Sequence, residues 1–149
     1  MAERVPDPEP SFDRPDPADR EGAYELLQRG LALMRRRHHA QAAVVLERAA
    51  RAEPSKGSIL EPLGRAYHHS GQYERARETF EALVEVDPSG HWAHFALAES
   101  LRKLGRLSEA RTHLKLAMAL SPRTELYGQA MARLDRLEGP GSGGSGAAA

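Results

Sequence analysis

Histidine is the residue type in this sequence best suited to bind a metal ion or to move a proton, and the 149 residues include seven of them. His91 and His94 are three residues apart, which places both on one face of a helix. His68 and His69 are adjacent, so their side chains leave a helix in different directions and do not readily chelate one ion. A transition-metal site would also need carboxylates that orient its ligands. We therefore expect histidines that pack or face solvent, and no metal site.

The sequence lacks the motifs of common enzyme classes. It contains no glycine-rich phosphate loop, no His-Glu-x-x-His zinc motif and no nucleophile elbow. Ser70 follows His69, but neighbouring side chains leave a helix about 100° apart. The absence of cysteine excludes a thiol nucleophile, thiolate zinc sites and disulfides. We expect a noncatalytic protein without a cofactor.

Trp92 and Phe95 are the residues best suited to anchor a binding partner. They are three residues apart on one helix face, beside the apolar column that contains Leu97. One interpretation is that both rings pack against the loop of the preceding repeat or simply cover a helix. The other is an anchor pocket, since tryptophan and arginine often carry binding energy, and burying each ring contributes about 1.5–3 kcal/mol. The sequence leaves both interpretations open.

The elements that position these side chains come from an internal repeat with a period of 34 residues. Ala42, Ala76 and Ala110 occupy one column of the repeat. Three further columns hold Pro54, Pro88 and Pro122; Gly30, Gly64 and Ala98; and Leu46, Phe80 and Leu114. The small residues indicate places where paired helices approach closely.

Each copy of the repeat predicts two helices. In the middle copy, Leu60, Leu63 and Tyr67 lie on one apolar stripe, and Gly71 ends that helix because glycine readily adopts the left-handed conformation. A second amphipathic helix runs from Tyr73 to the Asp-Pro at residues 87–88, where proline disfavours helical dihedrals in the residue before it.

These columns resemble the tetratricopeptide repeat (TPR) family. The middle copy supplies that family's residues in order: Leu60, Leu63, Gly64, Tyr67, Gly71, Tyr73, Ala76, Phe80 and Pro88. The resemblance implies an all-α fold, a right-handed superhelical solenoid of antiparallel helix pairs. It covers three repeats, at residues 23–56, 57–90 and 91–124, and a capping helix near 125–138.

The repeats form one expected domain, residues 21–138. Residues 1–20 hold six acidic and three basic side chains and five of the ten prolines, so we expect a disordered acidic tail. Residues 139–149 are expected to be a flexible Gly/Ser/Ala tail, either a linker or an expression scar. In the first repeat, Arg29 replaces a core leucine and Arg37 replaces the turn glycine, which fits an open end. In the capping helix we expect the apolar face to contain Leu126, Ala130, Met131, Leu134 and Leu137.

In TPR proteins, the first helices of successive repeats line a concave groove. The groove positions carried over by the resemblance are Tyr24, Leu27, Leu31, Arg35, Arg65, His68, His69, Trp92, Phe95, Glu99, Arg102, Lys103 and Arg133. Bases outnumber acids among them, which predicts a partner with acidic character and an apolar anchor. The Lys and Asn pattern by which some family members clamp chaperone tails is missing, so the resemblance does not extend to a chaperone-tail adaptor.

The sequence thus predicts a scaffold or adaptor that binds a protein or peptide segment in its groove. Two alternatives stay open: a self-associating homo-oligomer, and a regulatory subunit of an unidentified enzyme. The acidic tail is either a solubilising leader or a segment that competes for the groove.

Composition narrows the expected partners and setting. The formal net charge is zero, so nucleic acid is not an expected partner, and the basic run around Arg35 to His39 is interpreted as a solvated corner. No apolar run reaches the length of a membrane span, so we expect no membrane partner and a cytoplasmic location. Eighteen arginines against three lysines suggest a bacterial source.

Overall fold

The computed structural model describes residues 3–4 and 21–139. Within these ranges the chain forms helices and short turns, and no helix is long and apolar enough to cross a membrane. Apart from residues 3–4 and 139, the expected tails at 1–20 and 139–149 lie outside the described residues. The helices are α1 (Ala23–Arg35), α2 (His39–Ala52), α3 (Gly57–His69), α4 (Tyr73–Val86), α5 (His91–Lys103), α6 (Leu107–Leu120) and α7 (Glu125–Glu138).

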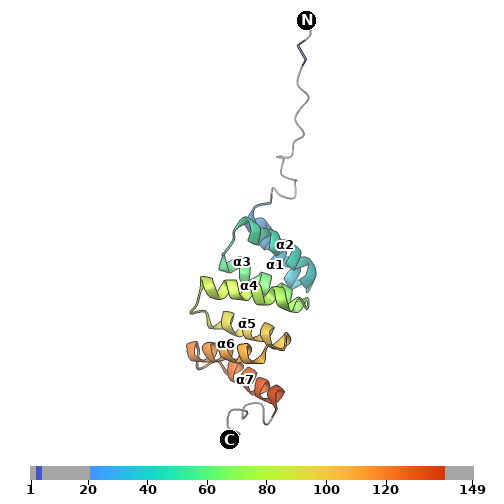
Figure 1. The fold of residues 1–149 in the computed structure, drawn as a ribbon. Helices are drawn as coiled ribbons and strands as arrows, with labels where there is room; N and C mark the ends of the chain where they lie inside the picture. The colour runs from blue at the N-terminus through green and yellow to red at the C-terminus, as the bar shows by residue number, and fades with distance from the viewer. Residues whose placement is uncertain (1–2, 5–20, 140–149) are drawn as a thin grey trace.

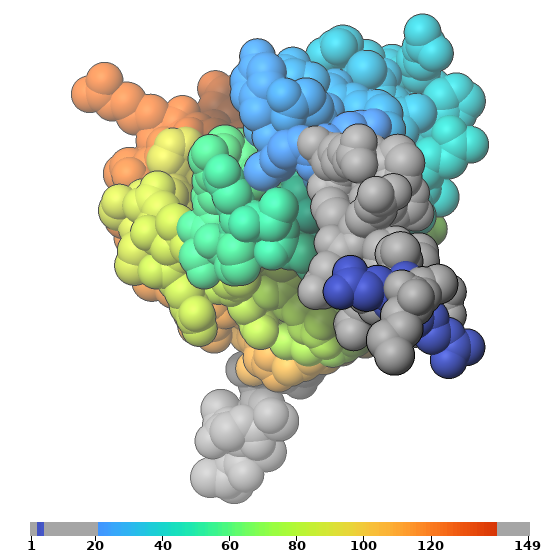
Figure 2. All heavy atoms as spheres, turned by 90° about the horizontal axis from the view of Figure 1, so that it is seen from above, coloured from blue at the N-terminus to red at the C-terminus, as the bar shows by residue number. Residues whose placement is uncertain are grey.

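The helices stack along one axis in chain order, each packed against the next (Figure 1). Seen from the N-terminal end, the successive pairs do not eclipse one another, because each is offset around the axis (Figure 2). This arrangement is the expected all-α solenoid of antiparallel helix pairs. One continuous core runs through it, from Leu46 in α2 to Leu134 in α7.

The repeated small residues make room for large side chains of the partner helix. A Cβ atom added to Gly64 would lie 2.4 Å from Cε1 of Phe80, and one added to Gly30 would lie 2.4 Å from Cδ2 of Leu46. Both distances are far shorter than van der Waals contact, so glycine is required for this close approach. The third repeat solves the same packing problem with Ala98, which is 2% exposed.

All three turns within the repeats have the same backbone geometry. Gly71 and Gly105 have φ angles of 80° and 77°, and Arg37 at the equivalent place has φ of 63°. In each turn this residue donates its amide hydrogen to the carbonyl three residues earlier, for example Arg37 to Met34 and Gly71 to His68. The fold therefore imposes a left-handed conformation on Arg37 that costs an L-residue about 1–2 kcal/mol.

The first repeat has an open outer side, as its arginines indicate. Arg29, in the column that holds leucine elsewhere, is exposed and forms an ion pair with Glu21 at 2.5 Å. The guanidinium therefore stays in contact with water at this column, where the other repeats bury a leucine.

The prediction of which residues form the apolar face of the capping helix is partly wrong. Ala130 and Leu134 are buried and Met131 is half-buried, but Leu126 and Leu137 are 47% and 56% exposed. Tyr127 is buried in their place at 2% exposure. The helix is rotated because the ring of Tyr127 packs on Phe95 of α5, with ring centroids 5.1 Å apart.

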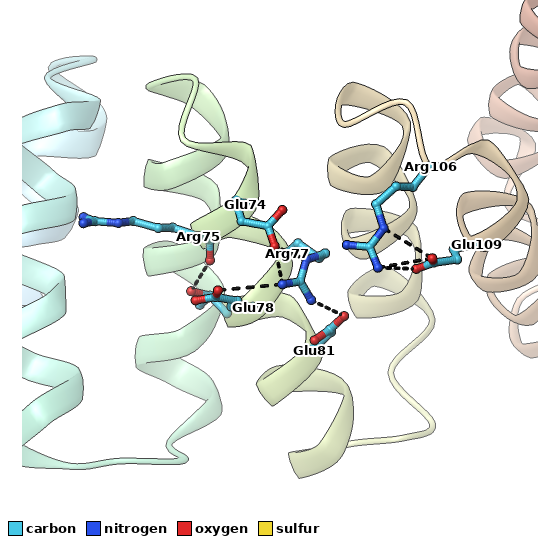
Figure 3. A network of polar contacts seen from close by, with 8 residues as sticks. Glu74, Arg75, Arg77, Glu78, Glu81, Arg106 and Glu109 are labelled. Carbon is cyan, nitrogen blue, oxygen red and sulfur yellow. Dashed lines mark hydrogen bonds and ion pairs between the residues drawn. The ribbon is translucent and has the colours of Figure 1, made fainter.

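Ion pairs follow the outer surfaces of the second helices of the repeats. On α4, Arg77 bonds to Glu81 at 2.7 Å and also to Glu74, and Arg106 at the start of α6 bonds to Glu109 at 2.8 Å (Figure 3). Arg77 thus contacts glutamates about one helical turn to either side of it on α4.

Candidate functional site

A pocket of about 220 Å³ lies between α3 and α5, and α4 contributes Phe80 to its wall. Helical spacing explains how the sequence builds it. The α3 side chains follow one another at i, i+3 and i+4, and the α5 side chains at i, i+3, i+4 and i+7, so each set shares one helix face. The lining residues are Arg65, His68 and His69 from α3, Phe80 from α4, and Trp92, Phe95, Ala96 and Glu99 from α5.

The apolar wall consists mainly of aromatic rings held by other rings. Trp92 is half-buried and meets Phe80 edge-on, with centroids 5.7 Å apart. Phe95 is also half-buried and lies against Tyr127. Trp92 therefore packs on helix α4 of the preceding repeat, and not on its loop as one interpretation of the sequence expected, and the same ring lines the pocket. Both rings are positioned on rigid helices before any ligand arrives.

The polar side of the pocket is organised by a serine buried behind it. Nδ1 of His68 is 3.3 Å from Oγ of Ser100, and Ser100 is 0% exposed. The same Oγ donates to the carbonyl oxygen of Ala96 at 3.2 Å. Burial, followed by the nearby charge of His69, lowers the pKa of His68, so its neutral ring is favoured.

Charges around the pocket are largely paired. Arg102 donates to Oε2 of Glu99 at 2.9 Å, and both side chains are less than one-fifth exposed. Arg133 approaches the same oxygen at 4.0 Å. Arg65 lies 3.7 Å from Glu61, while the ammonium group of Lys103 sits 5.7 Å from the centroid of the Tyr73 ring. These pairs offset part of the positive charge that the sequence predicted for the groove, so fewer basic side chains there are without an acidic neighbour.

The structure gathers six of the thirteen sequence-predicted positions into this pocket: Arg65, His68, His69, Trp92, Phe95 and Glu99. The other seven lie outside its lining. On α1, Tyr24 is 70% exposed and Arg35 is exposed, whereas Leu27 packs half-buried against the core and Leu31 is half-buried. Arg102, Lys103 and Arg133 lie further along α5 and α7.

Sequence reasoning missed Phe80 and Ala96 as pocket residues. Phe80 belongs to a second helix and had been placed in the core, where it is indeed 2% exposed. The one sequence signal for Phe80 was its position opposite Gly64 in the repeat. Because Gly64 has no side chain, the Phe80 ring can reach the space between α3 and α5. Ser100 carried no signal at all, because its role depends on a contact 32 residues away.

The histidine contacts elsewhere in the described part of the chain do not converge on a metal site. His39 and His69 lie with ring centroids 4.8 Å apart, and Nδ1 of His91 lies 2.6 Å from the Tyr127 hydroxyl. His94, 5% exposed, bonds to the carbonyl oxygen of Pro88 at 2.9 Å and lies 3.3 Å from Nδ1 of His113. Among residues 3–4 and 21–139, no group of three or more His, Cys, Asp or Glu side chains could hold a metal ion.

These features define a helical-repeat solenoid with a preformed pocket on the faces of its first helices. The tetratricopeptide repeat family model matches residues 27–89 and 63–123, which together make up more than half of the chain. The chain belongs to the tetratricopeptide repeat family.

Among curated proteins, the chain is similar to Superkiller complex protein 3 of Mus musculus, with 34% identity over 97 residues. It is also similar to the protein O-mannosyl-transferase TMTC1 of Mus musculus, with 28% identity over 105 residues. These matches cover 65% and 68% of this chain. The chain spans only 6% and 11% of the length of those relatives.

Solved structures share the fold at low identity. The first TPR of Spaghetti (RPAP3), bound to the HSP90 peptide SRMEEVD, has a TM-score of 0.74 at 15% identity, covering 79% of this chain and 94% of that one. MamA from Desulfovibrio magneticus RS-1 has a TM-score of 0.75 at 21% identity, and the match covers 78% of this chain and 66% of the MamA chain. YrrB, described as a TPR protein with an unusual peptide-binding site, has a TM-score of 0.72 at 20% identity. The match covers 75% of this chain and 58% of the YrrB chain.

Proposed function

We propose that this protein is a noncatalytic scaffold that binds a segment of a partner protein along its first helices, with one apolar side chain of that segment inserted in the pocket. The observation that carries the proposal is the pocket itself, with Trp92, Phe95 and Phe80 already packed around an open volume. Rings fixed in place lose little conformational entropy when a ligand binds, which favours affinity. A volume of about 220 Å³ is below the ~300–1,000 Å³ of typical small-molecule sites, and therefore suits a single side chain.

Charge supports an acidic character in the residues that flank the anchor. The groove positions carry Arg35, Arg65, Arg102, Lys103 and Arg133, and the acids facing them are Glu61 and Glu99. Arg35 and Lys103 are exposed, lie outside the pocket lining, and are the last residues of α1 and α5. Acidic residues on either side of the anchor would be attracted to these positions, mainly accelerating association at low salt.

Two structural neighbours support a peptide as the partner. The RPAP3 repeat domain is bound to a peptide, and YrrB is described as having a peptide-binding site. The bacterial and cytoplasmic setting expected from composition stays a prediction.

The test uses a displayed library of random peptides, selected on the full chain and then measured by calorimetry. Phe95→Ala removes one wall of the pocket, and we expect it to weaken recovered peptides by about tenfold or more, as for a truncated aromatic hot spot. Val44→Ala, on an exposed position of α2, is the control and should leave affinity unchanged. Circular dichroism establishes that both variants keep their helices. Peptides that bind wild type and Phe95→Ala equally would refute the proposal.

Self-association is a second candidate, favoured by the exposed leucines of α7. Leu126 and Leu137 are eleven residues apart, about three helical turns, so they share the outer face of the last helix. A second copy could bury this face. Light scattering across concentration, with Leu126→Glu and Leu137→Glu as the disrupting change, tests this role: a wild-type monomer at all concentrations excludes it.

A further inference from the structure

The contact between His68 and Ser100 determines which nitrogen of the imidazole carries the hydrogen. A serine hydroxyl has one hydrogen to donate. If Ser100 donates it to the carbonyl oxygen of Ala96, its oxygen can accept a hydrogen from Nδ1 of His68. Both contacts are then satisfied together only when the neutral His68 ring is protonated on Nδ1.

This tautomer leaves Nε2 of His68 as a bare hydrogen-bond acceptor. Within the described part of the chain Nε2 has no hydrogen-bond partner, and His68 lines the pocket. Glu99 on the opposite side is also an acceptor, and its Oε2 is already used by Arg102. The pocket therefore combines aromatic walls with acceptors, and the negative charge of Glu99 disfavours a carboxylate inside it.

We propose that the pocket selects a tyrosine side chain, whose ring packs against Trp92 and Phe95 while its hydroxyl donates to Nε2 of His68. Tyrosine combines an aromatic body with a terminal donor, which matches an apolar wall that ends in an acceptor. Phenylalanine would leave Nε2 without a partner once water is displaced, which weakens binding. The role of this tyrosine as the anchor of a partner protein rests on the proposed function, but the chemistry of the pocket can be tested separately.

The groups around His68 favour its acceptor form at neutral pH. Burial lowers its pKa, and the charges of His69 on α3 and of Lys103 and Arg102 on α5 act in the same direction. Glu99 on α5 opposes them, and Tyr73 of α4 packs edge-on against the ring at 5.2 Å. Acidification would protonate Nε2 and turn it into a donor, so the preference for a phenol should disappear at low pH.

The probes are 4-methylphenol and toluene, which reproduce the tyrosine and phenylalanine side chains. Trp92 is the only tryptophan, so a single indole N–H resonance reports binding in the pocket by NMR titration. At pH 7.5 we expect 4-methylphenol to bind about 3- to 10-fold more tightly than toluene, the value of one net hydrogen bond. An apolar pocket without an acceptor would instead favour toluene, because toluene is the more hydrophobic compound.

Two variants separate the hydrogen bond from general packing. His68→Phe keeps a ring in the wall and removes the acceptor, so the order of the two affinities should reverse. Ser100→Ala leaves the imidazole in place but releases its tautomer, so the preference should shrink while toluene binding stays near wild type. His38→Phe, the same change at an exposed position outside the pocket, should retain the wild-type preference.

The outcomes distinguish this inference from the proposed function. Toluene binding as tightly as 4-methylphenol to wild type, or a preference that survives in His68→Phe, overturns the tyrosine selectivity even if peptides bind. A phenol preference that depends on His68 supports the pocket chemistry, and a simultaneous failure of every library peptide would overturn only the proposed function.

Discussion

Replacing Gly64 by alanine tests whether the close approach of α3 and α4 governs both stability and the pocket. The new Cβ would lie 2.4 Å from Cε1 of Phe80 and 2.7 Å from Cδ1 and Cζ. Phe80 cannot simply turn away, since it is 2% exposed and its ring meets Trp92 edge-on. The substitution therefore forces either the helices apart or the ring toward the pocket.

The magnitude is a difference between two opposing effects. Glycine to alanine inside a helix gains about 1 kcal/mol of helix propensity. Overpacking a close-packed core costs about 1–3 kcal/mol. Because a whole ring edge is within 2.7 Å, we place the cost near the upper end and expect a net loss of about 1–2 kcal/mol in the free energy of unfolding.

Gly128 provides the matched control. It lies in α7, is exposed, and a Cβ there would meet nothing within 4 Å. Gly128→Ala should therefore show the propensity gain alone, a stabilisation of up to about 1 kcal/mol. The same substitution is thus expected to have opposite signs at two helical positions.

The assay is urea denaturation followed by far-ultraviolet circular dichroism and by the fluorescence of Trp92. The third repeat suggests the rescue, since it pairs Ala98 with Leu114 where the second pairs Gly64 with Phe80. Gly64→Ala combined with Phe80→Leu should be less destabilised than the sum of the two single changes by about 1 kcal/mol or more. A Gly64→Ala chain as stable as wild type, or strictly additive effects, would refute the packing argument.

Three further predictions concern the turn, the histidines and the cap. Arg37→Gly should raise the free energy of unfolding by about 0.5–1 kcal/mol in urea denaturation, because φ of 63° strains arginine; no gain would mean that this strain is absent. Burial lowers the folded-state pKa values of His68, His69 and His113, so the unfolded chain binds more protons, and the melting temperature should fall as pH drops below about 6.5, the ordinary histidine value. A melting temperature constant between pH 7.5 and 5.5 would contradict this. Arg111→Ala removes ion pairs from α6 to the end of α7, and should accelerate amide hydrogen exchange in α7 with little change in α3, as residue-resolved exchange can measure.

The fold was predictable because its signals are local. Helix stripes, turn glycines and the Asp-Pro at residues 87–88 act over a few residues, and the 34-residue period repeats them. Even the left-handed conformation of Arg37 follows from the period, because Arg37 occupies the repeat position that Gly71 and Gly105 hold in the other two copies. The capping helix was harder, since one copy without a successor leaves its rotation to packing, and there Tyr127 displaced Leu126 and Leu137 from the buried face.

For the candidate site, the sequence by itself determined which helix faces carry Trp92, Phe95 and Arg65, because side-chain direction along a helix follows from spacing alone. Only the tertiary structure decided that Phe80 closes the pocket and that Ser100 meets His68, since these contacts join different helices. The pairing of Glu99 with Arg102 and Arg133 likewise depends in part on how α7 docks. Local spacing thus placed the side chains on their helices, and the packing of helix on helix decided which of them meet.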